Sequence, residues 1–121
     1  MVDDAERAKL ARQFAGDMRR GVAELARLGY DAKLFRSMLA EHGPVEAARR
    51  LVLARDPSYG LWRLKTLRQL HMSVEMWVLL PWYKPLFDDT VRKQAEIKLR
   101  QLDVDVEGEL DRLVRKLERK E

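Results

Sequence analysis

One histidine and one carboxylate have the spacing of a metal-ligand pair or an acid–base pair. His71 and Glu75 lie four residues apart, so on one continuous helix their side chains would share a face. Ser73 lies between them, and serine is a preferred helix N-cap, which predicts that the helix is broken there. Zinc sites use three or four protein ligands, so this pair is too small a set. We therefore expect no metal site, and we expect His71 to lie in a turn between two helices.

Nucleophilic catalysis would need a base held beside a hydroxyl or a thiol. The sequence has no cysteine, and Ser58, Ser73 and Thr90 each fit a helix cap better than a nucleophile. It also lacks a glycine-rich phosphate loop and a dinucleotide-binding fingerprint. We therefore expect no catalytic residue, no cofactor and no enzyme. The alternative, an enzyme, would need a pocket that gathers Glu75, His71 and an arginine.

Glu75 is the one acidic residue between positions 61 and 87, and it lies in the most apolar run of the chain. Burying an unpaired charge is costly. We predict that Glu75 is a buried structural acid that bonds to the free N–H groups beside Ser73 or pairs with an arginine. The candidate arginines are Arg50, Arg63 and Arg68.

Basic residues form a second candidate site on the third and fourth predicted helices. They are Arg49, Arg50, Arg55, Arg63, Lys65 and Arg68. If the two helices are adjacent, these residues make a basic face beside Trp82 and Tyr83, which Pro81 and Pro85 would hold outward. Basic groups neutralise phosphates, and exposed aromatic rings stack on bases. The alternative is that the arginines are solvated helix faces and that both aromatic residues belong to the core.

Length and composition limit the class of protein. A chain of 121 residues is one domain, large enough to fold without a disulfide or a metal. The 24 Lys and Arg residues against 20 Asp and Glu residues give a mild net charge of +4. The acidic start of the chain does not resemble a signal peptide, and no run approaches the roughly 18 apolar residues of a membrane span. We expect a soluble, cytoplasmic protein with no membrane partner.

Apolar residues recur every three or four positions, which predicts helices, and no strand pattern is found. The predicted helices cover 4–28, 31–42, 44–54, 61–67, 74–80, 88–102 and 105–118. The fold class is therefore all-α, a compact single domain (1–121) of about seven helices. Its long amphipathic first and last helices surround the short helix 74–80, which we expect to be buried because it is apolar on almost every side. The prolines predict an extended or turning connection at 81–85.

The first and last helices have apolar stripes close to heptad spacing. One interpretation is that both pack on the central helices of the same chain. The other is that they extend past the core and pair with a partner protein or with a second copy.

Residues 30–102 also carry a set of small motifs. The motifs are Gly43-Pro44 followed by Ala47-Ala48, Gly60-Leu61 followed by Leu64, Leu70 leading to Ser73-Val74-Glu75 and Val78-Leu79, then Leu86-Phe87, and Ala95 with Leu99. This set resembles a small helical bacterial module of uncharacterised function. The resemblance implies a helical core with the first and last helices as extensions. It groups Gly43, Gly60, Ser73, Glu75 and Phe87 in one pattern and assigns no active site.

The sequence thus predicts a protein that acts by binding. In the first hypothesis it binds nucleic acid through the six basic residues. In the alternative it binds another protein, or a second copy of itself, through its terminal helices and through Trp82 and Tyr83. A phosphate-led complex loses affinity steeply with ionic strength, whereas an apolar helix interface does not.

Overall fold

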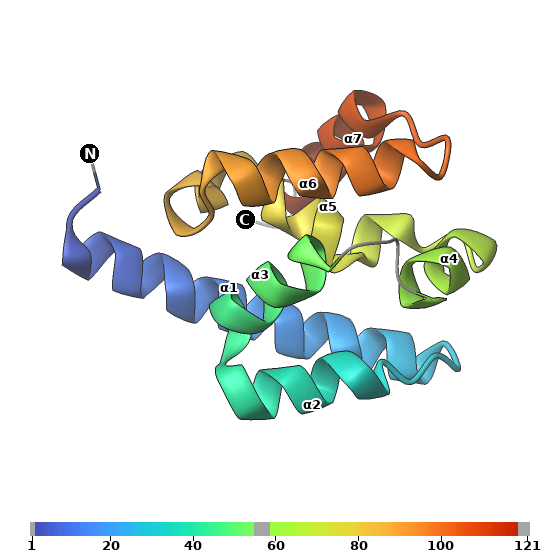
Figure 1. Cartoon of the computed structure of the whole chain (residues 1–121), viewed down its shortest axis with the longest axis horizontal. Coiled ribbons are helices and arrows are strands. Elements are labelled where there is room, and N and C mark those ends of the chain that lie inside the picture. Colours follow the sequence, from blue (N-terminus) through green and yellow to red (C-terminus); the bar gives the residue numbers. More distant parts are fainter. Residues whose placement is uncertain (1, 55–58, 119–121) are drawn as a thin grey trace.

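The computed structural model describes residues 2–54 and 59–118, and within these ranges the chain is helical with no strand (Figure 1). This confirms the predicted all-α fold. The α-helices are α1 (Asp4–Arg27), α2 (Lys33–His42), α3 (Pro44–Leu53), α4 (Tyr59–Thr66), α5 (Val74–Val78), α6 (Asp89–Arg100) and α7 (Val106–Glu118). Two 3-10 helices, η1 (Leu70–Met72) and η2 (Pro81–Leu86), flank α5. None of the described helices is long and apolar enough to cross a membrane.

Short polar side chains begin four of the helices by accepting a hydrogen bond from a backbone N–H three residues later. These caps are Asp3 for α1, Ser73 for α5, Asp88 for α6 and Asp105 for α7. Three residues at the start of α6 are possible caps, Asp88, Asp89 and Thr90, and Asp88 is the one that caps it; Ser58 lies outside the described residues. Asp31 does not cap α2, because its carboxylate binds Arg36 instead.

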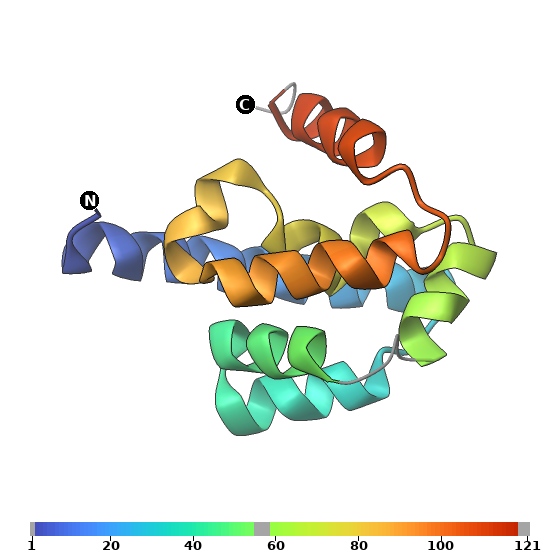
Figure 2. The same ribbon diagram turned by 45° about the horizontal axis from the view of Figure 1, so that its top comes forward.

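The short helix α5 lies at the centre of the fold, as predicted. Met76, Val78 and the following Leu80 are fully buried, and α5 contacts α3, α6, η1 and η2. In Figure 2 the α2–α3 pair lies on one side of α6, and α7 lies on the other. The helix ends at Val78 and not at Leu80, because the N–H of Leu79 bonds to the Met76 carbonyl, three residues back and not four.

The connection at 81–85 lies in the 3-10 helix η2, a run of tight turns, so it turns as one of the two predicted alternatives has it and is not extended. Pro81 occupies the first helical position, where its missing N–H costs no bond, and the N–H of Tyr83 bonds to the Leu80 carbonyl. Three aromatic rings then join η2 to α1. Phe14 meets Tyr83 edge-on at 5.0 Å and Phe87 at 5.1 Å between ring centroids.

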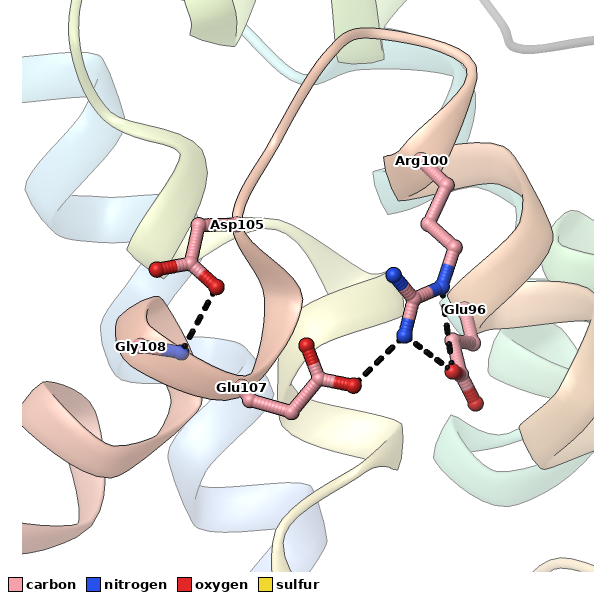
Figure 3. Close-up of polar contacts among 5 residues, drawn as sticks. All are labelled: Glu96, Arg100, Asp105, Glu107 and Gly108. Atoms are coloured by element: carbon pink, nitrogen blue, oxygen red, sulfur yellow. Dashed lines mark hydrogen bonds and ion pairs between the residues drawn. The ribbon is translucent and has the colours of Figure 1, made fainter.

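Both terminal helices pack on the core of their own chain. Phe14, Met18 and Leu25 of α1 are buried, as are Val106 and Leu113 of α7. The first turns of α1 are exposed and extend past the other helices (Figure 1). One exposed ion pair links α6 to α7: Arg100, which also pairs with Glu96 of its own helix at 2.7 Å, binds Glu107 at 2.5 Å (Figure 3). The buried stripes favour the interpretation that these helices complete the domain.

Candidate ligand-binding cavity

A cavity of about 330 Å³ lies between α1, α2, α4 and the η1–α5 segment. Its walls are apolar over most of their area, with side chains that include Met18, Val22, Phe35, Leu61 and Trp77. The polar side chains that reach the wall are Asp17, Tyr30 and Glu75. Small-molecule sites have this character, with apolar walls and a few polar groups that orient the ligand.

A glycine in the middle of α1 leaves part of this cavity open. Gly21 lines the cavity, and a Cβ atom placed on it would meet no atom within 4 Å. Glycine inside a helix costs roughly 0.5–1 kcal/mol relative to alanine. The chain therefore accepts a weaker helix at the position where a side chain would enter the cavity.

Glu75 is 2% exposed and lines the same cavity, so the prediction of a buried acid is confirmed. Burial raises the pKa of its carboxyl group, while its own backbone N–H and the charge of Lys98 act in the opposite direction. Its Oε2 atom has no hydrogen-bond partner among the described residues. Of the two predicted partners, the carboxylate has a first-turn N–H, its own, and not an arginine, because Arg50, Arg63 and Arg68 are exposed on α3, on α4 and just after α4.

Lys98 of α6 is the cation whose charge lowers the pKa of the Glu75 carboxyl group. It was not among the residues predicted from the sequence. Lys98 is fully buried, and its Nζ donates to the Leu51 carbonyl at 2.9 Å. A signal for its burial was present, because Lys98 continues the inward stripe of Val91, Ala95 and Leu102 at helical spacing.

The second carboxylate of the cavity, Asp17, is already bound on both oxygens. The Tyr83 hydroxyl donates to one oxygen, and Arg20 binds the other at 2.6 Å. Burial and the neighbouring Asp17 raise the pKa of the Tyr83 hydroxyl. Tyr83 is fully buried, so its predicted role as an exposed interaction residue is wrong; Trp82 is half-buried. The ring turns inward because Phe14 and Asp17 of α1 offer it both an aromatic contact and an acceptor.

His71 lies in η1, in the turn predicted for it, and its carbonyl accepts a hydrogen bond from Trp77 Nε1 at 3.0 Å. Burial and then the charge of Lys116 lower the pKa of its imidazole. Among the described residues, the cavity lining includes neither His71 nor an arginine. The grouping of Glu75, His71 and an arginine that an enzyme was expected to need is therefore not found there. No three histidine or acidic residues in the described ranges could hold a metal ion.

The six predicted basic residues differ in whether an acidic residue compensates their charge. Arg49 and Arg50 of α3 both pair with Glu46, at 3.1 and 3.5 Å. Arg63 and Arg68 are exposed and form no ion pair within the described chain. Arg55 lies outside the described residues. The basic residues near α4 are thus the ones whose charge is left uncompensated by an ion pair.

An exposed tryptophan, which the sequence reasoning did not assign to a site, accompanies this second group. Trp62 is 49% exposed, and Lys65 Nζ lies 5.9 Å from the centroid of its ring. The same Nζ donates to the Leu102 carbonyl. Trp62, and not Tyr83, is therefore the aromatic residue that the structure places beside basic side chains.

No family model, curated protein or solved structure in the comparisons matches this chain. The resemblance of residues 30–102 to a small helical module stays a prediction. Function is therefore inferred from the cavity and the surface of this chain.

Glu75→Gln is expected to raise the free energy of unfolding at neutral pH by about 1–3 kcal/mol, because it removes a buried charge that lacks a full set of partners. The raised pKa means that the folded state holds the Glu75 proton more tightly than the unfolded chain does. Stability should therefore fall as pH rises from the unfolded to the folded pKa of Glu75, and this fall should be absent in the variant. Urea unfolding across that pH range measures both effects.

The matched control is Glu41→Gln, because the Glu41 side chain is 72% exposed. This change should alter stability by no more than about 0.5 kcal/mol. Equal stability and an equal pH slope for wild type and Glu75→Gln would contradict the assignment of a buried, costly charge.

Proposed function

We propose that the protein is a non-enzymatic binding module that holds a small, mostly apolar molecule in the cavity between α1, α2, α4 and α5. The observation that carries this proposal is the cavity itself, about 330 Å³ with mostly apolar walls. Small-molecule sites are concave pockets with predominantly apolar walls and a few polar groups. An open apolar pocket of this size, with Glu75 in its wall, therefore suits a small ligand.

The way into the cavity supports the same proposal. Leu34 of α2 lines the cavity and is also 66% exposed, so the cavity reaches solvent at this residue. Phe35, the next residue of α2, is buried, so the helix directs Phe35 and not Leu34 into the core. A ligand could then enter past one flexible side chain, without unfolding of a helix.

Gly21→Leu is expected to abolish binding of the neutral naphthalene dye prodan, which fluoresces more strongly in apolar surroundings. The new side chain would occupy cavity space, since a Cβ at Gly21 meets nothing within 4 Å. The fold should be retained or strengthened, because leucine is a better helix former than glycine by roughly 0.5–1 kcal/mol. Dye fluorescence titration and thermal unfolding measure the two effects.

Ala23→Leu is the control, since it adds the same side chain to an exposed position of the same helix. It should bind prodan as the wild type does. Unchanged dye binding by folded Gly21→Leu, or no binding by the wild type, would contradict the proposal.

A second candidate function is nucleic-acid binding through α4. It is favoured by one specific observation, the exposed Trp62 ring beside Lys65 and the unpaired Arg63. An exposed tryptophan among cations can stack on a base while the cations neutralise phosphates. The face formed by Arg49 and Arg50 is weaker support, because Glu46 compensates both residues.

For this second function, electrophoretic shifts with single- and double-stranded DNA and RNA are expected to weaken steeply as salt rises. Trp62→Ala and Arg63→Gln should each weaken the shift, because they remove the stacking surface and a phosphate contact. Arg112→Gln should not, since Arg112 of α7 is paired with Glu109. Absence of any shift at low salt would rule the function out.

A further inference from the structure

We propose that the ligand of the cavity carries a protonated amine on an apolar body, and that Glu75 binds this amine. The inference rests on the proposed small-molecule function and adds the chemical class of the ligand. The structure supplies three lines of support: an acceptor without a partner, a second carboxylate that is already bound, and a wall without basic side chains.

The first support is the Oε2 atom of Glu75. Buried polar atoms in native proteins nearly always have a hydrogen-bond partner. Glu75 is 2% exposed, and its Oε2 has none among the described residues. The Oε2 atom is itself covered, so a molecule bound in the cavity that Glu75 lines would supply the missing donor by turning the carboxylate toward it. The backbone of Glu75 belongs to the first turn of α5, which the Ser73 cap holds in place.

The second support is the state of Asp17 across the same cavity. Tyr83 and Arg20 already occupy its two oxygens. Asp17 is therefore compensated by Arg20 and has little spare hydrogen-bonding capacity. Of the two carboxylates in the wall, Glu75 is the one that can still accept from a ligand.

The third support is the sign of the charge in the wall. The charged residues that line the cavity, in the described part of the chain, are Asp17 and Glu75, both acidic. Lys98 approaches Glu75 from α6, but its Nζ is engaged by the Leu51 carbonyl and it is not a lining residue. Arg20 compensates the charge of Asp17, so Glu75 is the carboxylate that favours a cation and disfavours a carboxylate or phosphate ligand. An alcohol could donate to Glu75 but would not balance its charge.

The test uses three molecules with the same eight-carbon chain and different head groups: octylamine, 1-octanol and octanoate. Each competes with prodan for the wild-type protein at neutral pH. Octylamine is expected to displace prodan at a concentration about tenfold or more below that of 1-octanol, because hydrogen bonds to charged groups are the stronger ones. Octanoate should be the weakest.

Two variants then assign the preference to one residue. Glu75→Gln should remove most of the advantage of octylamine over 1-octanol, while Asp17→Asn should keep it, because Asp17 has no free acceptor. Both variants are compared with wild type for prodan binding and thermal unfolding.

If prodan binds the wild type but octylamine and 1-octanol compete equally, the amine inference fails and the proposed function stands. If prodan does not bind the wild type, the proposed function fails and takes the inference with it. An equal loss of amine preference in both variants would overturn the assignment to Glu75. Should Glu75→Gln fail to fold, the wild-type ranking of head groups still decides whether the ligand is an amine.

Discussion

The helix α5 must be covered on every side, because it is only five residues long and all of them except Glu75 are apolar. The helices α3 and α6 and the 3-10 helix η2 contact α5 and bury Met76 and Val78. The remaining side, which carries Val74, Glu75 and Trp77, faces the cavity. One short helix thus belongs both to the core and to the wall of the site. A rigid core element of this kind holds site residues more precisely than a loop would.

The charges around α5 carry a local cost in the folded state. Lys98 partly offsets the burial of Glu75 from α6, but it leaves one carboxylate oxygen without a partner. Asp17, in contrast, is fully engaged through Tyr83 and Arg20, and this contact also fixes α1 on η2. Gly21 adds a second local cost by weakening α1 where it borders the cavity. Local costs of this kind are expected to gather at functional sites.

The sequence allowed the helices and their caps to be predicted, because these depend on residues a few positions apart. The spacing of Phe14, Met18 and Leu25 and the caps Ser73 and Asp88 are such local signals. The burial of Glu75 followed from its apolar neighbours. These features needed no knowledge of how the helices pack.

The cavity could not be predicted in this way, since its walls come from helices that are far apart in the sequence. Tyr83 shows the same difficulty: the prolines beside it indicated a break in regular helix, but not that Phe14 and Asp17 would receive its ring and hydroxyl. Lys98 lies on an apolar stripe, and its hydrogen bond to the Leu51 carbonyl helps to explain why a lysine is tolerated there. Trp62 likewise follows a helical apolar pattern and is nevertheless exposed.

The three tryptophans allow the central claim, a ligand site beside α5, to be tested in one nuclear magnetic resonance experiment. Trp77 lines the cavity, Trp62 lies on the basic surface of α4, and Trp82 lies in η2 against the first turns of α1. Their indole N–H signals can be followed while prodan is added to the wild-type protein. A site in the cavity predicts that the Trp77 signal moves most. An unmoved Trp77 signal, with or without shifts of Trp62 or Trp82, would contradict it.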